Sequence, residues 1–253
     1  MLILKQIILC FQFLTRLPLP SFVFSSSEKL PLAPTAWCFP LVGAFIGGLL
    51  WAALLLLEGL GVPFHLQCLS VLVLGIGLTG ALHEDGFADF FDGLGVYDRA
   101  RALEVMRDSQ VGSFGALALL VSFSWRGIAL MELGSVYLVG LSLLLTHIGA
   151  RGLMALMLLL PLARSDGLAA TSGKAPWLVV LIALALTGGV LFAVLPWFVA
   201  LMAFLISGAG LMIISLISLR RYGGLTGDVY GAGEQVCEML MLGVFASFLP
   251  SLM

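Results

Sequence analysis

Residues 175–219 read APWLVVLIALALTGGVLFAVLPWFVALMAFLISGAGLMIISLISL, a run of 45 positions without aspartate, glutamate, lysine or arginine. About 20 mostly apolar residues are enough to cross the hydrocarbon core of a bilayer as an α-helix. The run is therefore long enough for two membrane spans joined by a minimal turn. We place that turn near Pro196, because proline interrupts helices.

The composition of the whole chain agrees with this local pattern. Of 253 residues, 61% are hydrophobic and 10% are charged, whereas soluble domains carry about 25% charged residues. The mean hydropathy is +1.14 and the formal net charge is −2. These values exclude a disordered chain, a coiled coil and a basic nucleic-acid-binding domain. They predict an all-α, polytopic integral membrane protein surrounded by membrane lipid, with no nucleic-acid partner.

Further apolar runs extend this prediction along the chain, at residues 3–17, 37–57, 64–82, 112–131, 135–160 and 235–252. Together with the first two they give about eight transmembrane helices in a single integral domain, residues 1–253. The count falls to seven if the first segment is re-entrant.

The basic residues sort to one side of this arrangement. If the spans alternate in direction, one face receives segments 18–36, 83–111, 161–175 and 220–234. These segments hold Lys29, Arg99, Arg101, Arg107, Arg164, Lys174, Arg220 and Arg221, and the loops of the opposite face hold no lysine or arginine. The positive-inside rule predicts a cytoplasmic face that carries the active-site loops 83–111, 161–175 and 220–234. The expected location is the cytoplasmic (inner) membrane of a bacterium or archaeon.

An acidic motif lies on that face: His83-Glu84-Asp85-Gly86-Phe87-Ala88-Asp89-Phe90-Phe91-Asp92-Gly93. Asp85, Asp89 and Asp92 are spaced i, i+4 and i+7, so a helix would place them on one stripe. Like charges at this spacing repel one another, and a divalent cation would neutralise them. Oxygen ligands suit Mg²⁺, so we predict a magnesium site formed by these aspartates, with Glu84 as a further candidate.

Two glycine-rich segments accompany the motif on the same face, at 107–115 and 223–234. Glycine-rich loops let backbone N–H groups approach phosphate oxygens. Gly224, Thr226 and Gly227 are therefore expected to bind phosphate. Asp108 and Asp228 are candidates for the general base or for further metal ligands, and the sequence does not rank them.

Three arginines are expected to bind a pyrophosphate as charge-assisted donors: Arg16, Arg151 and Arg164. Arg151 follows His147 by one helical turn inside an apolar run, where an arginine normally faces a cavity or a partner. We expect Arg126 instead to lie near the outer end of its span and to extend toward Glu132 and the interface.

Taken together, these motifs resemble those of a known family. The acidic motif, followed by Gly93-Leu94-Gly95, closely resembles the signature of the cobalamin synthases, also called adenosylcobinamide-GDP ribazoletransferases. Further blocks are similar in order along nearly the whole chain: Phe13-Leu14-Thr15-Arg16-Leu17-Pro18, Phe39-Pro40-Leu41-Val42-Gly43, Met106-Arg107-Asp108-Ser109, Ala163-Arg164 and Gly223-Gly224-Leu225-Thr226-Gly227-Asp228.

The resemblance implies a Mg²⁺-dependent transferase that joins adenosylcobinamide-GDP to α-ribazole, or to its 5′-phosphate, and releases GMP. The product would be adenosylcobalamin or its 5′-phosphate. The resemblance leaves open whether other enzymes of cobalamin assembly dock on the charged face.

Two alternatives remain at this stage. A CDP-alcohol phosphatidyltransferase also carries an Asp-Gly-x-x-Ala element, but here Asp89 follows Ala88 where that family has arginine. A cation-coupled secondary transporter would bind its ion near the bilayer midplane, whereas the acidic residues here gather at one surface.

Overall fold

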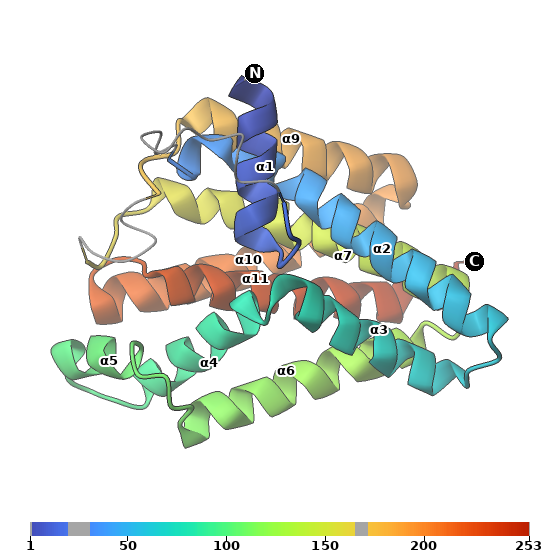
Figure 1. The fold of residues 1–253 in the computed structure, drawn as a ribbon, viewed down its shortest axis with the longest axis horizontal. Coiled ribbons are helices and arrows are strands. Elements are labelled where there is room, and N and C mark those ends of the chain that lie inside the picture. The colour runs from blue at the N-terminus through green and yellow to red at the C-terminus, as the bar shows by residue number, and fades with distance from the viewer. Residues whose placement is uncertain (1, 20–30, 165–171, 253) are drawn as a thin grey trace.

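The computed structural model describes residues 2–19, 31–164 and 172–252, and these form a bundle of helices (Figure 1). The α-helices are α1 (Leu2–Leu14), α2 (Phe39–Gly59), α3 (Phe64–Thr79), α4 (Leu82–Leu94), α5 (Arg99–Val105), α6 (Ser113–Glu132), α7 (Val136–Met154), α9 (Trp177–Val194), α10 (Trp197–Tyr222) and α11 (Gly227–Phe248). Short 3-10 helices are η2 (Ala33–Cys38), η3 (Ala155–Leu159) and η4 (Leu249–Ser251).

Within the described ranges, six helices are long and apolar enough to cross a membrane, or up to seven if α3 and α4 form one bent span. The all-α membrane architecture is thus confirmed, but the expected count of eight is not reached. Helix α1 has 13 residues, runs across the direction of the long helices and is not one of these spans (Figure 1). Helix α3 counts as a span only together with α4, and the count is then seven, the number given by the alternative in which the first segment does not span.

The turn expected near Pro196 is confirmed. Helix α9 ends at Val194, and Pro196 is the N-cap of α10. Proline fits there because the first residues of a helix have no intrahelical partner for an N–H group.

A sharp bend separates α3 from α4, and the two helix axes differ in direction by 87°. Gly80 and Ala81 at the bend both have left-handed backbones, with φ of 65° and 57°. Glycine adopts this conformation easily, whereas an alanine there carries strain. The bend directs the acidic motif on α4 away from the axis of α3.

Helix α7 lies within the bundle and packs closely against α2. A Cβ atom on Gly43 would lie 2.1 Å from the carbonyl oxygen of His147, and one on Gly47 would lie 2.5 Å from the Cα of Leu144. Small residues permit this approach of two membrane helices. The contact fixes α7, and with it His147 and Arg151, in the interior.

Two segments predicted as loops are largely helical. Segment 83–111 contains nearly all of α4 and the whole of α5, and α11 begins within segment 220–234, at Gly227. Helix α5 and the α10–α11 turn lie at the same end of the bundle, and the α2–α3 connection lies at the other (Figure 1). The charged motifs of these two segments therefore lie on helices and their termini, at the same end of the bundle.

Candidate active site

The first two acidic residues of the motif face in different directions. Glu84 is buried, with 8% of its surface exposed, whereas Asp85 is exposed. Adjacent residues on a helix point about 100° apart, so an inward Glu84 directs Asp85 toward the outside. The motif consequently contributes to two separate polar sites, an inner one and an outer one.

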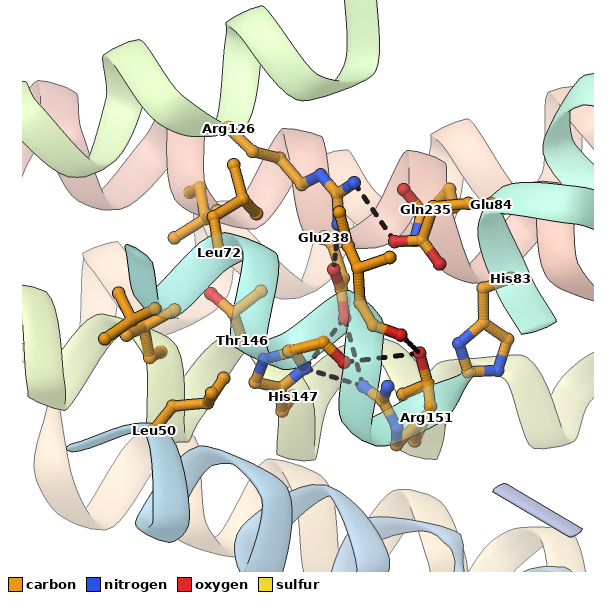
Figure 2. Close-up of a pocket in the computed structure, with 16 residues that line it drawn as sticks. Leu50, Leu72, His83, Glu84, Arg126, Thr146, His147, Arg151, Gln235 and Glu238 are labelled. Carbon is orange, nitrogen blue, oxygen red and sulfur yellow. Dashed lines mark hydrogen bonds and ion pairs between the residues drawn. The ribbon is translucent and has the colours of Figure 1, made fainter. Parts of the chain in front are cut away.

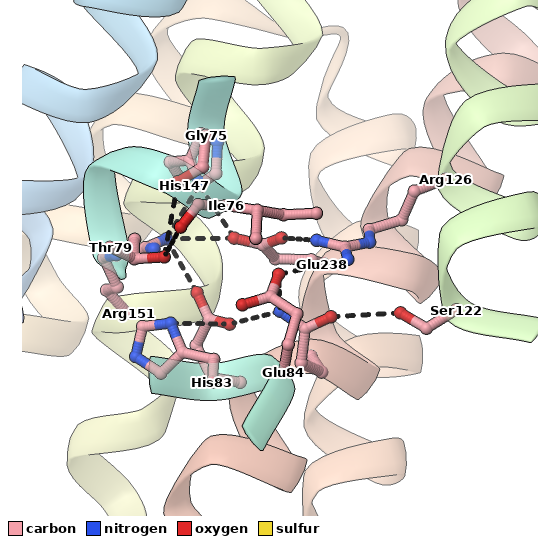
Figure 3. Close-up of polar contacts among 12 residues, drawn as sticks. Gly75, Ile76, Thr79, His83, Glu84, Ser122, Arg126, His147, Arg151 and Glu238 are labelled. Carbon is pink, nitrogen blue, oxygen red and sulfur yellow. Dashed lines mark hydrogen bonds and ion pairs between the residues drawn. The ribbon is translucent and has the colours of Figure 1, made fainter. Parts of the chain in front are cut away.

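The inner site is a buried ion-pair network. Arg126 on α6 contacts Glu84 at 3.1 Å and Glu238 on α11 at 3.0 Å. Gln235 also donates to Glu84, at 3.1 Å, and accepts from Ser122 at 3.0 Å (Figure 3). The network therefore ties the acidic helix α4 to α6 and α11.

The interfacial position expected for Arg126 is wrong. The residue is 3% exposed and faces the interior, where its charge is matched by two carboxylates. Those carboxylates lie 42 and 112 positions away in the chain, so no local pattern indicated them. Glu238 lies within the predicted last span, and an ionisable residue there is by itself a signal of a buried partner.

Arg151 on α7 completes the inner network. Its Nη1 atom lies 2.7 Å from Glu234 and 3.0 Å from Glu238, and His147 lies 2.8 Å from Glu238. The expectation that Arg151 faces a partner is confirmed. Its charge is matched inside the protein, and it does not line the cavity of the outer site. We therefore do not extend the phosphate-binding role to it.

A small cavity of about 20 Å³ lies among these side chains and the leucines of α2 and α3 (Figure 2). This volume suits about one water molecule. His147, Glu234 and Glu238 have ligand atoms within 4.8 Å of one another, a spacing that could hold a metal ion. Arg126 and Arg151 already neutralise these carboxylates, so a cation has little electrostatic reason to bind there.

The outer site lies at the mouth of a second cavity, of about 180 Å³, which Asp85 and Asp228 both line. Asp89 is half-buried, and its carboxylate is repelled by those of Asp228, Asp85 and Asp92, with Asp228 the strongest. Asp228 on α11 thus joins the stripe on α4. The sequence offered Asp228 as a possible further ligand on this face but did not rank it above Asp108.

Glycines permit the close crossing of α4 and α11 that creates this pairing. A Cβ atom on Gly86 would lie 2.7 Å from the backbone oxygen of Asp228. A Cβ atom on Gly231 would lie 3.1 Å from the backbone oxygen of His83. A side chain at Gly86 would therefore push Asp228 away from the stripe.

The glycine-rich segment before α11 also brings Arg164 to Asp228. Leu162 and Leu225 form a short parallel bridge, in which Leu225 donates to Pro161 and Ala163 donates to Leu225, both at 2.9 Å. Gly224 fits against this bridge, since a Cβ atom there would lie 2.3 Å from the backbone of Leu162. As a result, Arg164 Nη2 lies 3.5 Å from Asp228 Oδ2.

Asp228 Oδ2 also accepts a hydrogen bond from Thr226 Oγ1 at 2.9 Å. Thr226 is the N-cap of α11, and Gly227, which lines the larger cavity, is the first residue of that helix. A helix N-terminus favours anions, and Arg164 Nη1 is buried with no hydrogen-bond partner among the residues that the structure describes. Thr226, Gly227 and Arg164 therefore form a surface suited to a phosphate.

Asp92 has a different role from the rest of the stripe. Its two carboxylate oxygens accept the backbone N–H groups of Gly112 and Gly115, at 2.7 and 2.8 Å. These groups open α6 and have no partner within that helix. Asp92 thus caps α6 across the α4–α6 contact, and we do not extend the metal-binding role to it or to the paired Glu84.

The remaining predicted residues lie at the edge of this region. Asp108 is exposed between α5 and α6 and accepts the N–H of Gln110 at 3.1 Å. Arg16 is exposed, and its side chain packs over Gly80 at the α3–α4 bend. Its backbone N–H donates to Leu78 at 2.8 Å.

Fold and site together define a polytopic α-helical membrane protein with a carboxylate- and arginine-lined site at one end. The family described as cobalamin-5-phosphate synthase matches residues 6–246. The chain belongs to this family.

Named relatives agree with the family match. An adenosylcobinamide-GDP ribazoletransferase of Bradyrhizobium diazoefficiens is 39% identical over 86% of this chain and 84% of its own. Those of Mesorhizobium japonicum and Azorhizobium caulinodans are 37% and 38% identical, over 98% and 95% of this chain and 95% and 94% of their own. No solved structure matches the chain significantly.

Proposed function

We propose that this chain transfers ribazole, or ribazole 5′-phosphate, to adenosylcobinamide-GDP and releases GMP, the reaction for which its relatives are named. The observation that carries the proposal is that Asp85 and Asp228 line one cavity, while Asp89 lies close enough to be repelled by both and Arg164 lies 3.5 Å from Asp228. Family membership disfavours a phosphatidyltransferase or a transporter.

The transfer needs one new bond and one broken bond. A ribose hydroxyl of ribazole attacks the phosphorus attached to cobinamide, its O–H proton passes to a carboxylate, and the P–O bond to GMP breaks. Asp228 is the better of the two candidate bases, because it lines the cavity whereas Asp108 lies in an exposed loop. Thr226 and Arg164 both contact Oδ2 of Asp228, which leaves Oδ1 for the proton.

The donor set fits Mg²⁺. Asp85 and Asp89 supply only oxygen ligands, and the repulsion between these carboxylates and that of Asp228 would be relieved by a divalent cation. Asp85 and Asp89 would hold it, and Asp228 remains the base. When bound, the ion neutralises charge on the pyrophosphate. Most of its remaining ligands would be waters and phosphate oxygens, as is usual for Mg²⁺ in enzymes.

Positive groups around the carboxylates would hold the phosphates. Arg164 offers a guanidinium nitrogen that has no partner within the described ranges, and the start of α11 at Thr226 and Gly227 offers backbone N–H groups. Gly224 shapes this segment by its contact with Leu162. Arg16, exposed beside the α3–α4 bend, would bind a more distant phosphate.

The proposed orientation places this end of the bundle in the cytoplasm, with the protein in the inner membrane. Support comes from the eight lysines and arginines assigned to this face. The same exposed face is where other enzymes of cobalamin assembly would dock.

The test is GMP release by the purified protein in detergent. Adenosylcobinamide-GDP and α-ribazole are supplied with Mg²⁺, and parallel reactions omit ribazole or contain EDTA. We expect GMP only in the complete mixture. GMP release that is independent of ribazole would contradict the proposed transfer to ribazole. GMP release that EDTA does not diminish would contradict the proposed requirement for Mg²⁺.

A further inference from the structure

The 180 Å³ cavity that Asp85 and Asp228 line has both apolar and polar walls. Six apolar side chains line it, and we call them the apolar body: Phe13, Leu32, Phe39, Leu82, Met154 and Leu158. Its polar lining side chains are those of His83, Asp85, Ser172, Asp228 and Tyr230. Because Asp85 is exposed, the cavity opens beside the carboxylates of Asp85 and Asp228, and we call this part the acidic mouth.

Water alone is a poor occupant for the space beside the apolar body. One water takes about 30 Å³ of liquid volume, so the cavity has room for several, and each needs two to four polar partners. The leucine, methionine and phenylalanine walls provide none. An apolar group that displaces such water gains free energy on binding.

Aromatic side chains favour a planar apolar ligand. Phe13, Phe39 and Tyr230 reach the cavity from α1, α2 and α11. Aromatic rings pair with a second ring in stacked or edge-to-face arrangements, which adds to the gain from apolar burial. The shape and chemistry fit an aromatic bicyclic ring with few polar edges.

We propose that this cavity binds the aromatic base of ribazole. The inference rests on the proposed function, because it assigns one substrate of that reaction to one part of the site. With the base in the apolar body, the ribose lies at the mouth, where its hydroxyl meets Asp85 and Asp228. The benzimidazole ring presents mainly carbon to the walls, so few polar groups are buried without partners.

Leu158 and Leu159 provide a matched pair of variants for the test. Both belong to η3, but Leu158 lines the cavity, whereas Leu159 is 49% exposed and does not. Leu158→Trp would fill part of the base site, and Leu159→Trp adds the same volume outside it. A thermal melt in detergent verifies that each variant is folded, and Leu158→Ala replaces Leu158→Trp if that variant does not fold.

The measurement is equilibrium binding of α-ribazole to the purified full chain, without adenosylcobinamide-GDP. We expect Leu158→Trp to weaken binding about tenfold or more, since one methylene in an apolar pocket changes recognition by about that factor. Leu159→Trp should stay within about twofold of the parent. The benzimidazole ring of α-ribazole carries two methyl groups. The riboside without these methyl groups is smaller, so the Leu158→Trp substitution should weaken its binding less than it weakens the binding of α-ribazole. Leu158→Ala, by removing wall contacts, should also weaken binding.

Two outcomes of the binding measurement would overturn the proposal: equal effects of the tryptophans at Leu158 and Leu159, or no effect at Leu158. In the GMP-release assay, an increase in Leu158→Trp that is confined to the KM for adenosylcobinamide-GDP would also overturn it. Competition by phospholipid with unchanged ribazole affinity in Leu158→Trp would assign the cavity to an acyl chain instead. Failure of the function is a separate result. A parent protein that binds ribazole through Leu158 but releases no GMP would contradict the transfer reaction and leave this site in place.

Discussion

The guanidinium of Arg126 lies 3.1 Å from the carboxylate of Glu84, in the interior of the bundle. The next residue, Asp85, faces the larger cavity. One turn of α4 thus joins a buried structural network to the proposed site of chemistry. Some substitutions in this motif should consequently destabilise the fold, and others should abolish GMP release without changing stability.

Replacing Arg126 by alanine should destabilise the fold. Glu84 and Glu238 would each lose a buried cationic partner, and removing one member of a buried pair typically costs about 3–5 kcal/mol. The measurement is a thermal melt in detergent. The control is Arg101→Ala, which breaks an exposed pair with Glu104 worth less than about 1 kcal/mol. Similar melting temperatures for the two variants would show that the buried network contributes little.

Asp92→Asn should act on stability more than on catalysis. Asparagine has a single acceptor oxygen, so one of the N–H groups of Gly112 and Gly115 loses its partner. Leaving such a group unsatisfied costs about 1–3 kcal/mol. The folded variant should keep most of its GMP release. If the variant is as stable as the parent but has lost GMP release, Asp92 would instead be a metal ligand, as the sequence predicted.

Gly115→Ala should damage the same contact from the other side. The added Cβ would lie 2.3 Å from Asp92 Oδ2 and 2.9 Å from the carbonyl of Ala88. Such overpacking costs about 1–3 kcal/mol, which a thermal melt detects. Gly48→Ala is the matched control, because a Cβ there has no atom of the described residues within 4 Å, and it should be neutral or slightly stabilising. Equal melting temperatures would argue against the α4–α6 contact.

Cysteine labelling tests the proposed orientation. The four native cysteines are buried, so background labelling should be low. Cysteines introduced at Tyr97 and Arg220 should react only with reagent that reaches the cytoplasm, and one at Leu60 should react from outside. Tyr97 and Leu60 are 95% and 70% exposed, so access will not limit the reaction. Labelling of Tyr97 and Arg220 from opposite sides would contradict the shared face.

Hydropathy predicted most of the fold, and the exceptions have physical causes. The uncharged run at 175–219 gave two helices and a break at Pro196, since bilayer thickness sets the length of a span. The 87° bend at Gly80 was not predicted, because an apolar run does not show where its helix changes direction. The same limit affected α1, whose apolar pattern also fits a short helix across the bundle.

The site was predictable in its residue types but only partly in its partners. The spacing of Asp85 and Asp89 placed them on one stripe, while the approach of Asp228 depends on a helix crossing at Gly86. The positions of Arg126 and Glu238 required tertiary contacts over 112 residues. Local spacing predicts which side chains share a helix face, and packing between helices decides what they meet.

We propose that Asp89 acts in the transfer through a metal ion, and the Asp89→Asn variant separates this role from a structural one. Substitution keeps the size of the side chain and removes one negative charge, which should cost about 3 kcal/mol of transition-state stabilisation, or about a hundredfold in rate. Metal-free stability should be unchanged or slightly higher, because repulsion from Asp85 and Asp228 is relieved.

The decisive measurement is GMP release by parent and Asp89→Asn at matched levels of folded protein over a Mg²⁺ titration, with a thermal melt of each in EDTA. We expect about a hundredfold lower rate in the variant at every Mg²⁺ concentration, with a melting temperature at least equal to that of the parent. A variant as active as the parent across the titration, or one whose lost activity follows a lowered melting temperature, would contradict a metal-binding role of Asp89.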